Sequence, residues 1–205
     1  MPDKIEIRHI ELDVETVAEL FKLPQQIIDY LWERIDIAKK NKVCVKDTLA
    51  GNISHSYKLD DPQNAVIPYL FHILHNPNSN PKMYEFINSE VQRVYKIVNL
   101  KEHKLEPYLE SMWVNFQKKC EFQPLHTHDG AFSFVIWMDI PYHYKDESKL
   151  PIAKSSNKDP YGGNFSFVTS DGTSREVKTN LFRLSPEMNG YCCFFPSDLA
   201  HQVYP

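Results

Sequence analysis

The chain has 205 residues and a hydrophobic fraction of 42%, which suits one domain with a substantial core. The net charge is −4 and no lysine-arginine run stands out, so electrostatic wrapping of a nucleic acid is not expected. No signal-peptide core or membrane-length apolar run is present, and the four cysteines form no disulfide or CxxC framework. We therefore expect a cytoplasmic protein with free thiols and no membrane association.

The first half of the chain is expected to be mostly helical. Alternating apolar residues over Ile5–Leu12 predict a first strand, and Asp13 is a residue type that caps the helix predicted over Val14–Leu23. Helical spacing of apolar residues predicts further helices over residues 24–40, 66–74 and 83–98. Residues 43–59 read as a polar loop, and the Asn- and Pro-rich residues 76–81 are a break.

The second half changes to short apolar segments separated by turn residues. The predicted strands are Met112–Phe116, Ala131–Ile140, Phe165–Val168, Leu181–Leu184, Tyr191–Phe195 and Gln202–Tyr204. Turns are expected at residues 129–130, 159–163, 171–172 and 186–190, and the charged residues 142–159 are expected to form a lip or lid. Such spacing favours a jelly roll.

We therefore predict an α+β fold with a mostly β core, in which residues 1–205 form a single domain. Residues 1–104 would be a helix-rich support region packed on one sheet, and residues 105–205 would be the core that carries the functional site.

The most informative motif is His126-Thr127-His128, followed by His201 near the end of the chain. Two histidines one residue apart share one side of a β-strand, and a distant strand could bring the third alongside. Imidazole nitrogen suits Fe(II) or Zn(II), and three protein ligands leave positions open for chemistry. The sequence therefore predicts a metal site of His126, His128 and His201. The plainer alternative is that the histidine pair is an ordinary surface or hydrogen-bonded feature.

Asp129 follows the pair directly and would point away from it on a regular strand. A turn at Asp129-Gly130 could override that alternation, so Asp129 is held as the alternative to His128 as a ligand. It could also accept a hydrogen bond from an imidazole, or be a plain turn residue. His72 and His75 on a predicted helix are a much weaker alternative pair for a metal.

Four segments, in order, resemble one known family. They are Trp113-Val114-Asn115, Pro124-Leu125-His126-Thr127-His128 with the strand up to Trp137, Tyr161-Gly162-Gly163-Asn164-Phe165-Ser166-Phe167, and Gly190 to Pro205 with its Phe195-Pro196-Ser197 and His201-Gln202-Val203 motifs. Together they resemble the Fe(II)- and 2-oxoglutarate-dependent oxygenases, particularly the prolyl-hydroxylase-like bacterial and phage proteins. The resemblance covers about residues 112–205.

The resemblance implies a double-stranded β-helix, the cupin-like form of the jelly roll, with Fe(II) as cofactor, 2-oxoglutarate as co-substrate and O2 as oxidant. It implies hydroxylation of an unactivated C–H bond, with a peptidyl proline, another amino-acid residue or a small molecule as substrate. Asn115, and beside it Trp113, are the candidates for contacting the co-substrate, although both also suit a strand interior. Nothing in the sequence indicates the oligomeric state.

The chain departs from the family pattern at two places. His128 stands where the family has Asp or Glu, and the basic residue that would anchor 2-oxoglutarate is expected beyond Pro205. Lys118 and Arg183, on predicted strands, are weak substitutes for that anchor. Two other hypotheses therefore stay open. One is a three-histidine, cupin-type enzyme that does not use 2-oxoglutarate, a zinc hydrolase included, and the other is a non-catalytic binding module.

Overall fold

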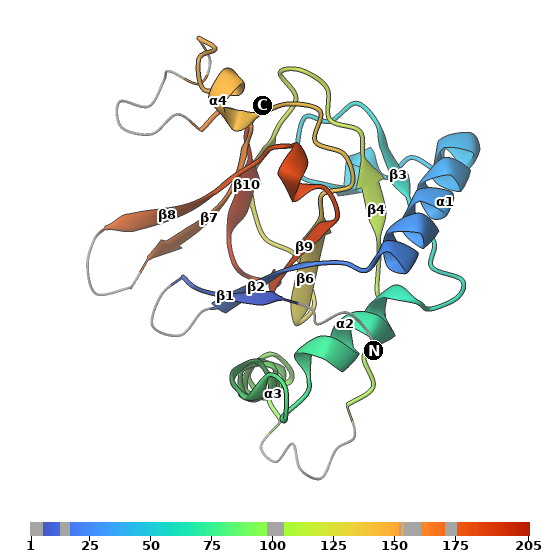
Figure 1. Ribbon diagram of the computed structural model, residues 1–205, viewed down its shortest axis with the longest axis vertical. Coiled ribbons are helices and arrows are strands. Elements are labelled where there is room, and N and C mark those ends of the chain that lie inside the picture. Colours follow the sequence, from blue (N-terminus) through green and yellow to red (C-terminus); the bar gives the residue numbers. More distant parts are fainter. Residues whose placement is uncertain (1–5, 13–16, 98–104, 152, 154–160, 171–175) are drawn as a thin grey trace.

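The computed structural model describes residues 6–12, 17–97, 105–151, 153, 161–170 and 176–205 (Figure 1). Its strands are β1 (Ile7–Glu11), β2 (Val17–Lys22), β3 (Ser56–Lys58), β4 (Trp113–Asn115), β5 (Gln123–His126), β6 (Phe132–Ile136), β7 (Asn164–Ser170), β8 (Val177–Arg183), β9 (Tyr191–Pro196) and β10 (His201–Val203). Its helices are α1 (Gln25–Asn41), α2 (Val66–Leu74), α3 (Pro81–Tyr95) and the short α4 (Tyr144–Glu147).

The described strands form three antiparallel sheets. The first sheet has the order β1-β2-β9-β6, the second sheet has the order β5-β10-β7-β8, and β3 pairs with β4 in a small ribbon. Within the described residues neither four-stranded sheet closes into a barrel. The architecture is therefore mixed α+β, as predicted, with two antiparallel sheets in a sandwich-like arrangement.

The first sheet is buried on both of its faces, and β9 shows this most directly. Cys193 and Phe195 belong to the apolar cluster shared with the second sheet, whereas Cys192 and Phe194 belong to the cluster shared with the helices. Successive side chains of a strand point to opposite faces, so a continuous apolar run is what a strand in this position requires. The order of layers is helices, first sheet, second sheet, and α1, α2 and α3 lie away from β7 and β8 (Figure 1).

Local signals explain where the helices begin and end. α1 buries Leu31, Ile35 and Ala38, which recur at helical spacing, and it ends at Lys42, whose left-handed backbone donates its N–H to the carbonyl of Ala38. The Asp61 carboxylate accepts hydrogen bonds from two backbone N–H groups at the start of α2, each at 3.0 Å. The Asn80 side chain accepts from the N–H of Met83 at the start of α3.

Most predicted elements of the first half are confirmed. The strand predicted over Ile5–Leu12 contains β1, and the three later helices correspond to α1, α2 and α3. The helix predicted over Val14–Leu23 is wrong, because residues 17–22 are the strand β2. The apolar run is so short that its periodicity does not distinguish a strand from a helix. In the structure these residues pair with β1 on one side and with β9 on the other, and this pairing stabilises a strand. Asp13 lies outside the described residues.

The polar loop predicted over residues 43–59 is wrong at its end, where β3 pairs with β4. In the second half each predicted strand is found, and β5 is an additional strand of four residues interrupted by Pro124, which lowers its strand signal. The predicted lid contains α4, while residues 152 and 154–160 and the turn at 171–172 lie outside the described residues.

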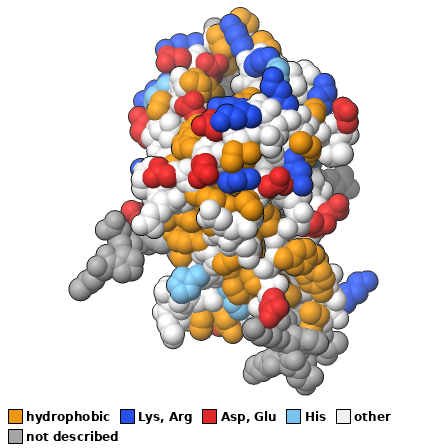
Figure 2. Space-filling view, turned by 90° about the vertical axis from the view of Figure 1, so that its right-hand side faces the viewer, with side chains coloured by type: hydrophobic (Ala, Val, Ile, Leu, Met, Phe, Trp, Pro, Cys, Tyr) orange, Lys and Arg blue, Asp and Glu red, His pale blue; other side chains and the backbone are white. Residues whose placement is uncertain are grey.

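The face seen in Figure 2 carries acidic and basic side chains interspersed with one another over its upper half. No field of a single sign dominates this face, in keeping with the net charge of −4. None of the described helices combines the length and the apolar character needed to cross a membrane.

Candidate metal centre

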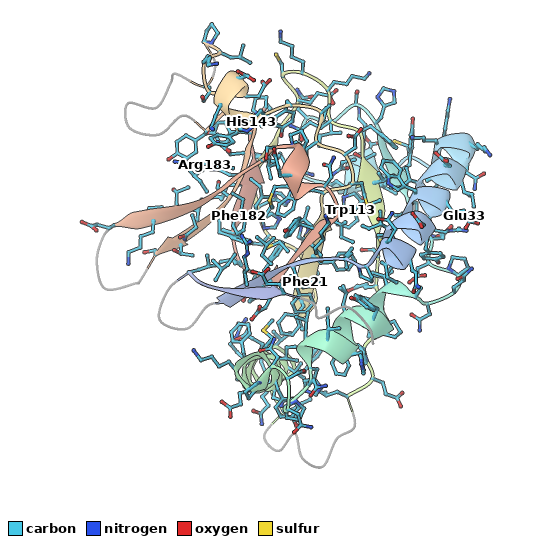
Figure 3. The ribbon with its side chains drawn as sticks, in the orientation of Figure 1. Phe21, Glu33, Trp113, His143, Phe182 and Arg183 are labelled. Carbon is cyan, nitrogen blue, oxygen red and sulfur yellow. The ribbon has the colours of Figure 1, made fainter. Side chains whose placement is uncertain are left out.

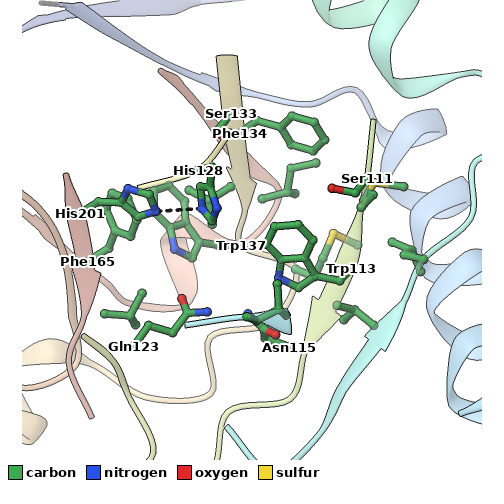
Figure 4. A pocket seen from close by; sticks show the side chains of 18 of the residues that line it. Ser111, Trp113, Asn115, Gln123, His128, Ser133, Phe134, Trp137, Phe165 and His201 are labelled. Carbon is green, nitrogen blue, oxygen red and sulfur yellow. Dashed lines mark hydrogen bonds between the residues drawn. The ribbon is translucent and has the colours of Figure 1, made fainter. Parts of the chain in front are cut away.

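The fold brings His126, His128 and His201 together, and Figure 4 shows the last two joined by a hydrogen bond. His126 is the last residue of β5 and His201 the first of β10, and these two residues are register partners in the second sheet. One ring nitrogen from each histidine lies within 4.8 Å of the other two. Among the described residues this is the one such group of possible metal ligands.

The expected reason for the convergence of His126 and His128 is wrong. Strand β5 ends at His126, so strand alternation does not orient His128. Instead, the backbone N–H of His128 donates to the carbonyl of Ser197 at 2.8 Å, and Ser197 N–H donates to Ala131 at 3.1 Å. These bonds pin the turn after β5 to the turn between β9 and β10. A pair of tertiary hydrogen bonds therefore brings the third imidazole beside His201.

The rings of His126 and His201 are oriented by the same kind of hydrogen bond, from Nδ1 to the carbonyl two residues earlier. The Nδ1 of His126 lies 2.7 Å from the carbonyl oxygen of Pro124, and the Nδ1 of His201 lies 2.8 Å from that of Leu199. A carbonyl oxygen only accepts, so Nδ1 carries the proton in both rings. In the neutral rings Nε2 then carries the lone pair that can bind a metal, which is the arrangement that metal-binding histidines use; in His201 this atom accepts from the Nε2–H of His128.

The spacing of the ring nitrogens suits one ion. The Nε2 atoms of His128 and His201 are 3.2 Å apart. Two nitrogens at that separation, each about 2.1 Å from a common ion, subtend about 100° at it, between octahedral and tetrahedral values. All three ring nitrogens lie within 4.8 Å of one another, whereas two such bonds span at most about 4.2 Å, so a pair near that outer limit would meet one ion after a small rotation of the rings.

Burial favours the neutral form of two of these imidazoles, those of His128 and His201. His201 is 4% exposed, and burial lowers its pKa to about 3, aided by His126 and His128 and opposed by the Leu199 carbonyl. The ring of His201 lies between 5.0 and 6.3 Å from three phenylalanine rings, those of Phe165, Phe167 and Phe195. Burial also lowers the pKa of His128, with a smaller contribution from His126, while Asp129 opposes the shift. Protons therefore compete little with a metal at neutral pH.

The other predicted site residues lie at different distances from this group. Asp129 is exposed and is not part of the three-histidine group, so the structure does not bring it together with them. The ring centroid of Trp113 is 5.6 Å from that of His128. The Oδ1 of Asn115 accepts a hydrogen bond from Ser56 Oγ at 2.7 Å. Both residues line a cavity of about 2030 Å³ that also reaches the histidines (Figure 4).

Lys118 and Arg183 were the substitutes considered for the basic residue that would bind 2-oxoglutarate, and neither belongs to the histidine group. Lys118 lies beyond the end of β4 rather than on a strand, and its side chain is exposed, although it lines the cavity. Arg183 is the exposed last residue of β8, and its guanidinium lies 5.5 Å from the ring centroid of Tyr144, beside His143 (Figure 3). Arg183 is therefore held on the outer surface by the segment that was predicted to be a lid.

The weaker histidine pair consists of His72 on α2 and His75 directly after it, and the described structure does not place them in a group of three possible ligands. His75 stacks between Phe71 and Tyr84, and its Nε2 lies 2.9 Å from Asn88 Oδ1. The sequence did not reveal three main-chain contributions to the site: the carbonyls of Pro124 and Leu199 and the backbone of Ser197. Every residue has these backbone groups, so the residue type does not indicate which of them will orient a histidine.

No protein-family model matches this chain, and neither a curated protein nor a solved structure matches it.

Proposed function

We propose that the protein is a non-haem iron enzyme in which His126, His128 and His201 hold Fe(II), and that it uses 2-oxoglutarate and O2 to hydroxylate an unactivated C–H bond. The supporting observation is the convergence of three imidazoles at a large cavity lined by helices, by the β3–β4 ribbon and by strands of both larger sheets. The sheet orders are compatible with the jelly roll that this proposal assumes. The substrate would be an amino-acid residue of a peptide or a small molecule, and the site would act in the cytoplasm.

The donor set fits the metal better than it fits the co-substrate. Three imidazoles suit Fe(II) and leave coordination positions free for other ligands. Iron with 2-oxoglutarate and O2, when bound, supplies an oxidation that yields succinate, CO2 and a hydroxylated product. For the carboxylates of 2-oxoglutarate, the described lining offers neutral groups near the histidines, such as Asn115 and Gln123, and several lysines, but no arginine.

The surrounding side chains would have two tasks. Phe165, Phe167 and Phe195 exclude water from the buried side of His201, which protects a reactive centre from solvent. Because Asn115 Oδ1 already accepts from Ser56, the amide N–H groups of Asn115 are the ones that can serve a ligand in the cavity. Trp113 lines the same cavity, with its ring centroid 5.6 Å from that of His128.

The absence of an arginine from the described cavity lining favours a second candidate. A three-histidine enzyme that does not use 2-oxoglutarate, including a zinc hydrolase in which bound water is the nucleophile, needs no such anchor. This candidate shares the metal centre and differs only in whether a dicarboxylate binds beside the ion.

An anaerobic titration separates these functions. Metal-free protein receives Fe(II) and then 2-oxoglutarate, and the visible charge-transfer band of the iron chelate is recorded. We expect one equivalent of Fe(II) to bind and the band to saturate at one equivalent of 2-oxoglutarate. Aerobic turnover should then release succinate, even without substrate.

His126→Ala should abolish both Fe(II) binding and the band. His72→Ala, which removes an exposed histidine on α2, is the matched control and should leave both unchanged. Iron binding without a band or succinate would refute the use of 2-oxoglutarate and favour the second candidate. A protein that binds no metal stoichiometrically would refute both and favour a non-catalytic binding module.

A further inference from the structure

We infer that Trp113 is a positioning residue that sets the orientation of His128 and thereby the geometry of the metal centre. This inference rests on the metal centre of the proposed function. It assigns to Trp113 a role toward the third ligand rather than toward the co-substrate.

The three histidines are not held equally. His126 and His201 sit on paired strands, and each has its Nδ1 bonded to the carbonyl two residues earlier. His128 lies outside the strands, and within the described residues no carbonyl holds its ring; instead its Nε2 lies 3.2 Å from the Nε2 of His201, the atom through which His201 would bind the metal. Ser197 fixes the backbone of His128 but not the rotation of its side chain. A shared metal ion would replace the bond between the two Nε2 atoms, so in the metal-bound protein packing is what remains to orient the ring of His128.

Trp113 supplies that packing from a separate element. Its ring is tilted by 60° to that of His128 at 5.6 Å, within the range of favourable aromatic pairs. The remaining aromatic neighbours of His128 in the described structure are the two other ligands, at 5.0 and 4.9 Å. Trp113 is thus the only described aromatic neighbour of His128 that is not itself a candidate ligand.

The position of Trp113 is in turn well defined. It lies on β4, where it is the register partner of Lys58 on β3, and the hydrogen bond from Ser56 Oγ to Asn115 Oδ1 ties the ribbon together two residues away. Since the same ribbon forms one wall of the cavity, the geometry of the third ligand is linked to the element that a cavity ligand would touch.

Cobalt(II) binding under exclusion of air tests this inference, because its visible spectrum reports the number and arrangement of ligands. We expect Trp113→Ala to weaken Co(II) binding by about tenfold or more, as loss of a residue that orients a metal ligand does, and to change the visible bands. Trp113→Phe, which keeps an aromatic ring, should retain most of the Co(II) affinity and most of the wild-type visible spectrum. Trp32→Phe, which alters a tryptophan lining the same cavity on α1, is the control and should bind as the wild type does.

A double-mutant cycle with His128→Ala distinguishes positioning from general stability. If Trp113 acts through His128, then Trp113→Ala should cause no further loss of Co(II) affinity when His128 is already alanine. Equal affinity and identical spectra for wild type and Trp113→Ala would overturn the inference while leaving the metal centre intact. A wild-type protein that binds no Co(II) would instead overturn the proposed function, and this inference with it. Far-UV circular dichroism checks that each variant is folded. If Trp113→Ala does not fold, Trp113→Leu, which removes the aromatic ring but keeps an apolar side chain, should show the same weakened Co(II) binding.

Discussion

Replacing His201 with glutamine should make the stability of the metal-free protein less sensitive to pH. The folded protein holds His201 buried, with a pKa of about 3. In the unfolded chain a histidine has a pKa of about 6.5. As the pH falls below about 6.5, the unfolded chain takes up a proton that the folded protein does not, and the free energy of unfolding decreases. The loss continues until the pH reaches the folded-state pKa.

The size of the effect follows from the two pKa values. Between pH 7 and pH 5 the unfolded state gains about 2 kcal/mol from protonation of this one histidine. Over the full window down to pH 3 the same linkage would reach at most about 5 kcal/mol. Carboxyl groups also titrate at the acid end, so the interval from pH 7 to pH 5 isolates the histidine best.

Urea unfolding at pH 7 and at pH 5, with a chelator present and tryptophan fluorescence as the signal, measures this difference. Between pH 7 and pH 5 the free energy of unfolding should decrease by about 2 kcal/mol more in the wild type than in His201→Gln. His72→Gln, at an exposed position on α2, is the control, and its free energy of unfolding should decrease by as much as that of the wild type. If wild type and His201→Gln lose the same free energy, His201 is not buried in its neutral form and the reasoning about the metal centre fails.

Three further predictions concern the metal and the packing. Fe(II) at 100 times its dissociation constant should raise the free energy of unfolding by about 2.7 kcal/mol, measured anaerobically by urea unfolding, and the gain should vanish in His126→Ala but persist in His72→Ala. Phe167→Ala, at a fully buried position between the two sheets, should cost about 3–5 kcal/mol by the same assay, and a loss below about 1 kcal/mol would contradict the packing. Gly163→Ala should lower the melting temperature, because φ is +66° there and a Cβ would lie 2.9 Å from the side chain of Glu147; an unchanged melting temperature would show that this turn tolerates a side chain.

Local patterns in the sequence were enough to predict most elements. The spacing of Leu31, Ile35 and Ala38 identifies α1, because one face of a helix must be apolar to pack on a sheet. The uninterrupted apolar run of β9 indicates a strand covered on both faces, and its side chains do contribute to both apolar clusters. The residues that come together at the site, His126, His128 and His201, were also identifiable, because few residue types provide metal ligands. Their role as ligands stays a prediction.

Tertiary structure decided the features that depend on partners distant in sequence. The apolar run of β2 suits a helix or a strand, and only pairing with β1 and β9 selects the strand. His128 reaches the site through a hydrogen bond to Ser197, and not through strand alternation. Side-chain identity specifies which groups can bind a metal, whereas their orientation depends on backbone carbonyls and neighbouring rings that are assembled only when separate strands pair and pack.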